Sequence, residues 1–183
     1  MGKYFGTDGI RGEANDSLTV DIALKVGEYL GALHKGKKII VGQDTRLSST
    51  MFASAIAAGA TAMGADVYML GVCATPALAY TITNDGFAGG VMISASHNPY
   101  HDNGLKVFAG NGMKLSDDVQ DEIEKYIDGE ISLELATASD IGIVVEYHHG
   151  LQKYIDRIES LIDVRFDDMK IVLDLANGSA ISS

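Results

Sequence analysis

The sequence is poor in cysteine, with one in 183 residues, so no disulfide can form within the chain. Such chains are typical of reducing compartments, and we expect a cytoplasmic protein. The cysteine, Cys73, lies in the apolar stretch 67–74, which favours a place in the core over a role as nucleophile. Lys3, Asp8 and Arg11 interrupt any apolar run near the N-terminus, so no signal peptide is expected.

Long apolar runs and basic charge are also lacking. No stretch approaches the roughly 18 consecutive apolar residues that a membrane-spanning helix needs. The chain has 14 Lys and Arg against 25 Asp and Glu, which gives a formal net charge of −11, and no basic stripe interrupts this acidity. The charge therefore argues against nucleic acid or an anionic membrane as a partner.

Proline occurs only twice, whereas glycine occurs 21 times. This combination is typical of α/β proteins, in which tight loops join strands to helices. Hydrophobic residues make up 46% of the chain, which is enough for a packed core and excludes a disordered protein. The length suits one domain, or one domain with an appendage.

Hydrophobic periodicity predicts alternating helices and strands through most of the chain. Helices are expected at 19–34, 50–63, 75–84 and 117–128, and strands at 38–42, 66–70, 88–93 and 105–108. Ser17 or Thr19 is a candidate cap for the first helix, Ser48 or Ser49 for the second, and Thr75, followed by Pro76, for the third. The alternation predicts an α/β fold, a three-layer αβα domain with a mostly parallel mixed sheet.

The C-terminal part changes character. Residues 129–149 are less regular and are interpreted as a boundary, a helix is expected at 151–161, and KIVLDLANG at 170–178 is predicted to form a buried strand. We therefore expect one domain over residues 1–148 and the start of a second, similar domain over residues 149–183. Because a strand and its loop make an unusual domain end, the chain is interpreted as a fragment of a longer protein.

A dense polar cluster, SASHNPYHDNGLK at 94–106, directly follows the predicted strand at 88–93. Ligands of open parallel sheets bind at the carboxyl ends of strands, so this cluster is the first candidate site. Ser96 can serve as a nucleophile, a phosphate carrier or a plain loop hydroxyl. A serine hydrolase is disfavoured because Ala95 and His97 flank the serine, so the glycine-flanked nucleophile elbow is absent.

Two other interpretations of this cluster stay open. His97, His101 and Asp102 are residue types that bind metals, although nothing in the sequence fixes their geometry. The dipeptide NP at 98–99 and DNG at 102–104 are ordinary turn formers, so the cluster also fits a plain surface loop.

Two further clusters combine glycine with charge. FGTDGIRG at 5–12 surrounds an aspartate and Arg11 with three glycines, which let backbone amides approach an anion while arginine offers a bidentate donor for phosphate. Its glycine spacing matches neither a Walker loop nor a dinucleotide fingerprint. GQDTRLSS at 42–49 ends a predicted strand with Asp44 and Arg46, and a salt-bridged loop explains it equally well.

FGTDGIRG, GQDTRLSS and ISASHNPYHDNGLK, in this order, resemble the α-D-phosphohexomutase family over essentially the whole chain. The opening MGKYFGTDGIRGEAN is similar to the branch that acts on glucosamine phosphates. The resemblance implies an enzyme that interconverts a sugar 6-phosphate and 1-phosphate, for UDP-N-acetylglucosamine and peptidoglycan precursor synthesis. It also implies a phosphoserine that donates its phosphoryl group, and a bisphosphate intermediate that reorients and returns the other phosphate.

The motif match identifies Ser96, not Ser94, as the phosphoserine. Arg11 and Lys106 match positions that the family places beside the phosphoserine. The resemblance therefore implies that both stabilise phosphoryl charge and that Lys106 is a candidate for proton transfer. His97 matches a family histidine that orients the phosphate or moves protons.

The resemblance further implies one Mg²⁺ per full-length enzyme, bound through the phosphate on Ser96 and an aspartate-rich loop, DGDGDR. The sequence contains no DGDGDR, so we expect an incomplete metal site and no turnover by the isolated chain. Asn98 and Pro99 are expected to shape the loop, and Asp44 and Arg46 to support it.

The expected partner is a small sugar phosphate. The oligomeric state stays open, with a homodimer among the alternatives. Two alternative functions also stay open: a mutase of the same family that acts on mannose or glucose phosphates, and a non-catalytic phosphate-binding domain of the same fold.

Overall fold

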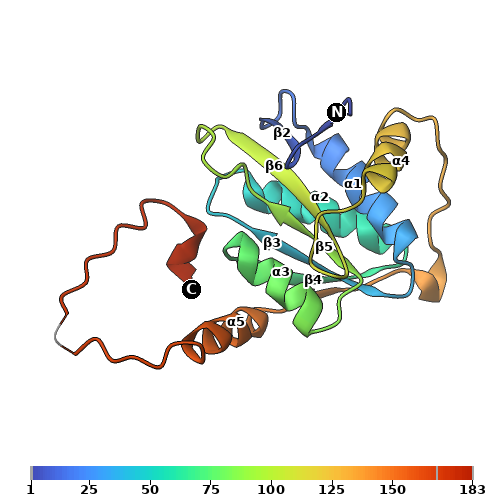
Figure 1. Cartoon of the computed structure of the whole chain (residues 1–183). Coiled ribbons are helices and arrows are strands. Elements are labelled where there is room, and N and C mark those ends of the chain that lie inside the picture. The colour runs from blue at the N-terminus through green and yellow to red at the C-terminus, as the bar shows by residue number, and fades with distance from the viewer. Residues whose placement is uncertain (1, 168, 183) are drawn as a thin grey trace.

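The computed structural model describes residues 2–167 and 169–182, in which seven strands form one mixed sheet with helices on both faces (Figure 1). The strands are β1 Phe5–Gly6, β2 Gly9–Glu13, β3 Lys38–Gln43, β4 Asp66–Val72, β5 Gly89–Ile93, β6 Asp102–Ala109 and β7 Val144–Glu146. The helices are α1 Val20–Leu33, α2 Ser49–Ala62, α3 Thr75–Asn84, α4 Asp117–Ile127 and α5 His149–Glu159, with short 3₁₀ helices at Ala138–Asp140 and Ser179–Ser182. None of the helices within the described ranges is long and apolar enough to cross a membrane.

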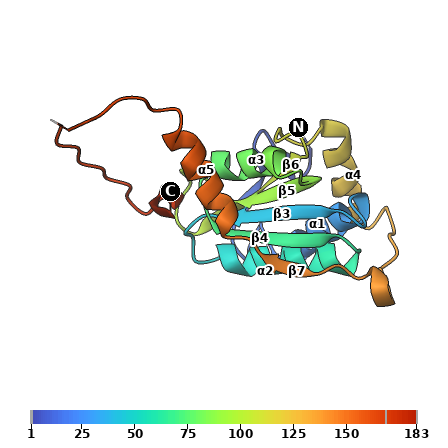
Figure 2. The ribbon, with the colours of Figure 1, turned by 90° about the horizontal axis from the view of Figure 1, so that it is seen from below.

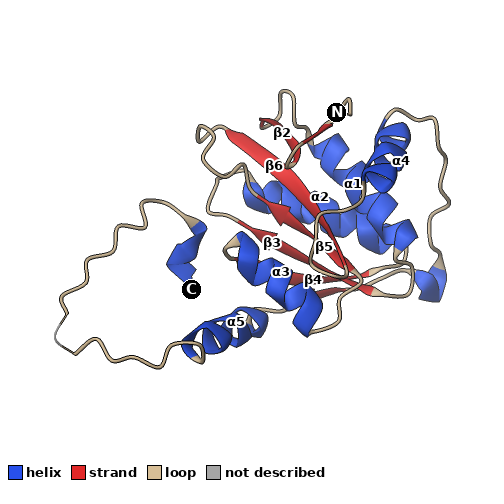
Figure 3. Ribbon diagram, viewed as in Figure 1, coloured by secondary structure: helices blue, strands red, loops and turns tan. Residues whose placement is uncertain are grey.

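The sheet has the strand order β1-β2-β6-β5-β3-β4-β7 (Figure 3). β5, β3, β4 and β7 pair with one another in parallel. β6 pairs antiparallel with β5, and β2 and β1 continue the sheet in the same antiparallel manner. The predicted three-layer α/β fold with a mixed sheet is confirmed, and the parallel pairing lies in the block that contains the central strands.

Helices cover both faces of the sheet, with α1, α2 and α4 on one face and α3 and α5 on the other (Figure 2). Successive side chains of a strand point to opposite faces, so one strand contributes to both cores. In β3, Ile39 and Val41 join the cluster beneath α1 and α2, whereas Ile40 joins the cluster beneath α3. All five residues of β5 are buried, as expected of a central strand that is covered on both faces.

Helix starts follow the predicted capping chemistry only in part. Of the two predicted candidates, Thr19 caps α1, because its Oγ1 accepts a hydrogen bond of 3.3 Å from the Ile22 N–H. The predicted cap of α3 is wrong, since the helix begins at Thr75 itself and Ala74 occupies the capping position. Pro76 still lies in the first turn of α3, as expected, where its missing N–H costs no hydrogen bond.

The polar cluster is only partly a loop. β6 begins at Asp102, so the stretch 102–104 is extended strand and its prediction as a turn is wrong. The reason is tertiary: in the antiparallel ladder Asn103 pairs with Gly12, and Gly104 pairs with Arg11. This pairing satisfies backbone groups that a local turn would otherwise have to satisfy.

The C-terminal part departs from the predicted pattern. The irregular segment 129–149 contains β7, which extends the sheet beside β4. α5 lies where a helix was predicted and packs on α3, with the ring centroids of Tyr154 and Tyr80 5.7 Å apart. Residues 170–178 form no strand and are largely exposed, so the predicted buried strand is wrong for the structure described here. No described strand pairs with residues 170–178. Without a partner strand, their backbone groups have no sheet hydrogen bonds that would keep the segment extended and buried.

Candidate active site

A cavity of about 700 Å³ opens where the loops after β3 and β5 meet the start of α3. Parallel strands place their carboxyl ends at one edge of a sheet, so loops that are distant in sequence converge there. Ser96 and His97, from the loop after β5, line this cavity together with Lys106 from β6. Three of the four predicted catalytic residues therefore share one cavity.

Ser96 occupies an exposed and strained position in the serine loop, which we define as residues 94–102. Its φ of +56° lies in the left-handed region, which residues other than glycine rarely adopt. Its N–H donates a hydrogen bond of 3.0 Å to the Ser94 Oγ, whereas its own hydroxyl has no partner within the described residues. Ser94 is only 7% exposed. Of the two serines, Ser96 is thus the one with an exposed and unengaged hydroxyl.

Arg11 reaches the serine loop from β2. Its Nη1 donates to Asn98 Oδ1 at 3.2 Å, and its Nη2 donates to Asp8 Oδ2 at 2.9 Å. Its Nε is buried and has no partner in the part of the chain that the structure describes. Gly104, opposite Arg11 in the ladder, leaves room for this side chain, since a Cβ there would lie 3.1 Å from Arg11 Cγ. Arg11 therefore flanks the serine loop through Asn98.

Lys106 is a half-buried cation without a counter-charge. Its side chain forms no hydrogen bond or ion pair with any described residue. It lines the large cavity and also a second one, of about 230 Å³, between the first two strands and β6. An unpaired ammonium at a cavity wall attracts an anion, and the low-dielectric surroundings strengthen that attraction.

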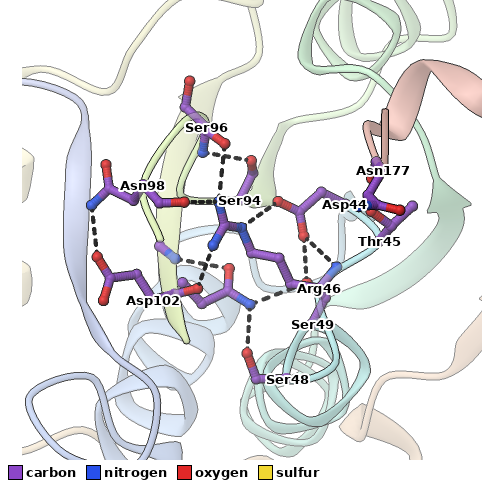
Figure 4. A network of polar contacts seen from close by, with 12 residues as sticks. Asp44, Thr45, Arg46, Ser48, Ser49, Ser94, Ser96, Asn98, Asp102 and Asn177 are labelled. Atoms are coloured by element: carbon purple, nitrogen blue, oxygen red, sulfur yellow. Dashed lines mark hydrogen bonds and ion pairs between the residues drawn. The ribbon is translucent and has the colours of Figure 1, made fainter. Parts of the chain in front are cut away.

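Arg46 lies at the centre of the polar network under the serine loop (Figure 4). Its Nε donates a hydrogen bond of 3.0 Å to Asp44 Oδ2. Its two terminal nitrogens donate to four backbone carbonyls of the serine loop, those of Ser96, Asn98, Pro99 and Asp102. The sequence motifs predict Arg46 only as a supporting residue, because backbone acceptors leave no pattern in a sequence that would reveal this role.

Asp44 anchors Arg46 from below. The residue is 7% exposed as a whole, and its Oδ1 accepts hydrogen bonds from the Ser49 hydroxyl at 2.7 Å and from the Arg46 backbone N–H at 3.0 Å. The Asn103 amide donates to the hydroxyls of Ser48 and Ser49 at 2.9 and 3.1 Å. The two serines predicted as helix caps thus bind the network instead, and Ser48 makes no side-chain cap hydrogen bond.

Two other candidates from the sequence, the His97–His101–Asp102 group and Cys73, do not form sites of their own. His97, His101 and Asp102 do not combine into a metal site, and residues 2–167 and 169–182 contain no group of three or more His, Cys, Asp or Glu side chains that suits a metal ion. Cys73 is fully buried, and this burial raises the pKa of its thiol to about 12, so the thiol stays protonated at neutral pH. Its predicted place in the core is confirmed.

Comparison with known proteins identifies the family. The family model described as phosphoglucomutase/phosphomannomutase, alpha/beta/alpha domain I, matches residues 2–134. The chain is 52% identical over 185 residues to the phosphoglucosamine mutase of Lachnoclostridium phytofermentans, covering 98% of this chain and 41% of that protein. It is 49% identical over 190 residues to the phosphoglucosamine mutase of Brevibacillus brevis, covering 100% of this chain and 42% of that protein.

A solved structure agrees with these sequence relatives. A phosphoglucomutase/phosphomannomutase family protein from Burkholderia thailandensis superimposes with a TM-score of 0.68 at 25% identity, covering 82% of this chain and 34% of that one. The chain spans about two fifths of the length of the curated relatives named above. It belongs to the phosphoglucomutase/phosphomannomutase family, and residues 2–134 match the α/β/α domain I of that family.

Proposed function

We propose that this chain is the serine-bearing part of a phosphoglucosamine mutase. The cytoplasmic enzyme isomerises glucosamine 6-phosphate to glucosamine 1-phosphate for UDP-N-acetylglucosamine and peptidoglycan precursor synthesis. The observation that carries the proposal is the exposed hydroxyl of Ser96 in a cavity that is also lined by Lys106, neither side chain having a partner among the residues that the structure describes. The two phosphoglucosamine mutases that are 52% and 49% identical to this chain support the glucosamine phosphate branch over the branches that act on mannose or glucose phosphates.

The proposed reaction consists of two phosphoryl transfers. In the first, the Oγ–P bond of phosphorylated Ser96 breaks and a sugar hydroxyl oxygen forms a bond to the same phosphorus, while that hydroxyl gives up its proton and Ser96 Oγ takes one up. In the second, Ser96 Oγ gives up its proton and forms a bond to the other phosphorus of the reoriented bisphosphate, while the bond from that phosphorus to the sugar oxygen breaks and this oxygen takes up a proton. The serine ends as it began, and substrate and product are isomers.

The residues around Ser96 suit this chemistry. Phosphoryl transfer spreads charge over the phosphoryl oxygens, so positioned cations contribute most of the catalysis. We assign charge stabilisation and proton transfer to Lys106, which lines the same cavity, and charge stabilisation to Arg11, which contacts the serine loop through Asn98. We assign His97, beside the carrier and exposed, to orienting the phosphate or moving a proton.

A divalent cation, Mg²⁺, belongs to this proposal, and the described residues do not complete a site for it. When bound, Mg²⁺ would neutralise phosphoryl charge. Phosphorylated Ser96 offers an oxygen, but both oxygens of Asp44 already accept hydrogen bonds from Arg46 and Ser49. No group of three metal-binding side chains exists in the part of the chain described. No step above is therefore routed through the metal.

We also propose that residues 1–148 form the phosphoserine domain and that residues 149–183 begin a second domain. The length of the curated relatives, more than twice that of this chain, supports this division. On this proposal the remaining ligands of the metal and the sugar come from elsewhere in a longer protein. The isolated chain is then expected to show no turnover.

The test is a comparison of substrates with the full-length protein that carries this sequence. Glucosamine 6-phosphate, mannose 6-phosphate and glucose 6-phosphate are assayed in the presence of Mg²⁺ and the matching sugar bisphosphate. We expect the highest kcat/KM with glucosamine 6-phosphate and a loss of about 10³-fold or more in Ser96→Ala. A preference for another hexose phosphate assigns the chain to another branch, and no turnover of any of the three favours a non-catalytic domain.

A further inference from the structure

Arg46 uses every donor that it has. A guanidinium carries five N–H groups. One binds Asp44, and the other four bind the serine-loop carbonyls of Ser96 and Asn98, at 3.0 and 2.9 Å, and of Pro99 and Asp102. These contacts join residue 46 to a loop some fifty residues further along the chain, so a local turn does not explain them.

The serine loop has few hydrogen bonds of its own. Its backbone makes two turn-like bonds, from the Asn98 N–H to the Ala95 carbonyl and from the Asp102 N–H to the Pro99 carbonyl, both at 3.1 Å. The carbonyls of Ser96 and Asn98 are therefore left for Arg46. Arg46 therefore donates more hydrogen bonds to the carbonyls of this loop than the loop's own backbone does, and Ser96 is the residue of the loop with the left-handed φ.

The base of this contact is rigid. The Arg46 and Asp44 side chains are 11% and 10% exposed, so the pair is largely desolvated. Asp44 is held in turn by the Ser49 hydroxyl, at the start of α2, and Ser49 by the fully buried Asn103 of β6. A guanidinium fixed by two layers of hydrogen bonds can impose a geometry on the loop above it.

We propose that Arg46 is a positioning residue for Ser96: it fixes the left-handed conformation of the phosphate carrier and binds the loop carbonyls so that their negative dipoles are neutralised beside the phosphoryl group. This inference rests on the proposed function of Ser96. A phosphoserine carries about −1.5 to −2 charges at neutral pH, so four uncompensated carbonyl oxygens nearby would repel it. The assignment separates two roles, because Lys106 has its donors free for the phosphate while Arg46 has none free.

The kinetic test compares Arg46→Lys with wild type in the full-length protein. Lysine keeps a positive charge beside Asp44 but lacks the planar fork that reaches four carbonyls. We expect kcat to fall about 10- to 100-fold, because a small misplacement of a reacting group lowers the rate by such a factor. KM for the sugar phosphate should stay within about twofold of the wild-type value. Arg157→Lys, at an exposed position of α5, is the matched control and should leave both constants unchanged. A rise in KM at constant kcat would mean that Arg46 binds the substrate phosphate directly, which overturns the inference.

The second test needs no catalysis and uses the 183-residue chain itself. Amide hydrogen exchange is measured in wild type, Arg46→Lys and Arg157→Lys. We expect exchange of the Asn98 and Asp102 amides to accelerate at least about tenfold in Arg46→Lys only, while the amides of β3 and α2 stay protected. Unchanged exchange in the serine loop overturns the positioning role of Arg46, even where the mutase reaction is established. A Ser96 that is never phosphorylated overturns the proposed function, but it does not change the exchange result.

A second variant covers the case in which Arg46→Lys unfolds the chain. Asp44→Asn keeps the shape of the anchor and removes its charge, so Arg46 loses its ion pair but retains its carbonyl acceptors. We expect the same pattern, with a smaller loss of kcat and a smaller acceleration of exchange in the serine loop. The proposal is contradicted if Arg46→Lys is globally unfolded while Asp44→Asn keeps the wild-type kcat and the wild-type exchange rates in the serine loop. In that case Arg46 would contribute only to stability.

Discussion

At the scale of single residues, the site separates groups that are held from groups that are free. Ser94 is buried and its hydroxyl is engaged, whereas the neighbouring Ser96 hydroxyl is exposed and unengaged. Arg46 is fully bonded and Lys106 is not. A group that must meet a transferred phosphoryl group has to keep its donors or acceptors available, so the free members of each pair are the proposed reacting ones.

Lys106→Met tests the free cation. Because Lys106 has no partner among the described residues, the substitution should change the free energy of unfolding by less than about 0.5 kcal/mol. Loss of a positive charge at the phosphoryl oxygens should lower kcat/KM about 10²- to 10³-fold. Steady-state kinetics and urea unfolding of the full-length protein measure the two effects.

The control for this substitution is Lys37→Met. Lys37 is exposed and lies before β3, at the opposite end of that strand from the large cavity. The substitution Lys37→Met should leave kcat/KM unchanged. An equal loss of activity in both variants would show that general charge, rather than the place of Lys106, supports the reaction.

At the scale of elements, close packing of α1 on α2 positions the base of the site. α2 begins at Ser49, which binds Asp44, so the place of this helix fixes the anchor of Arg46. Glycines allow the approach: a Cβ on Gly59 would lie 2.7 Å from the Glu28 backbone nitrogen and would also overlap the Leu24 carbonyl oxygen. Such contacts with backbone cannot be relieved by a rotamer change.

Gly59→Ala should therefore destabilise the protein by about 1–3 kcal/mol. Helix propensity alone predicts the opposite sign, since alanine is about 1 kcal/mol better than glycine inside a helix. Ala58→Gly, on the exposed side of the same helix, is the control and should cost about 1 kcal/mol. Denaturant unfolding measures all three proteins, and stabilisation by Gly59→Ala would refute the tight helix contact.

Sequence patterns predict the elements well where periodicity is long. The apolar stripe of α1 and the apolar runs of β3 and β5 can be read directly from the local sequence, and the predicted helix and strands are confirmed. The strand at 102–104 and the three-residue β7 depend on a partner strand from elsewhere in the chain. A tertiary cause of this kind leaves little trace in local composition.

The candidate site follows the same rule. Convergence of Ser96, His97 and Lys106 at one cavity is predictable from motif positions and from the geometry of parallel sheets. The contacts of Arg46 with four carbonyls are not, because every residue has a carbonyl and the fold selects which ones meet the guanidinium.

At the scale of the whole molecule, a carboxylate joins the start of the chain to α4. Glu124 accepts hydrogen bonds from the backbone N–H groups of residues 3–5, at 2.7 to 2.8 Å. Burial opposes ionisation of Glu124, but these three hydrogen bonds outweigh it and lower the pKa below the ordinary value of 4.5. This contact fixes β1, which leads into the strand that carries Arg11.

The lowered pKa of Glu124 sets the sign of a pH dependence. A carboxylate with a depressed folded pKa contributes stability above its unfolded pKa and loses that contribution as the pH falls through the folded pKa. Glu124→Gln should therefore lower the free energy of unfolding by about 1–2 kcal/mol at pH 7. This difference from wild type should shrink as the pH falls below 4.5, the ordinary pKa of the Glu124 carboxyl. Urea unfolding from pH 7 to about pH 3.5 follows the difference.

Glu122→Gln is the control on the same helix. Its side chain is 44% exposed and pairs only with Lys125 within the described residues, so the cost should stay below about 0.5 kcal/mol. A Glu124 effect that grows as the pH falls would contradict the account of this contact.

The most direct test of the central claim is the position of the phosphate. The full-length protein is incubated with glucosamine 1,6-bisphosphate, digested, and the peptide that contains residues 94–106 is sequenced by mass spectrometry. The account predicts phosphate on Ser96 in wild type and in Ser94→Ala, and neither phosphate nor mutase activity in Ser96→Ala. Phosphate on Ser94, or an active enzyme that never carries phosphate at residue 96, would contradict it.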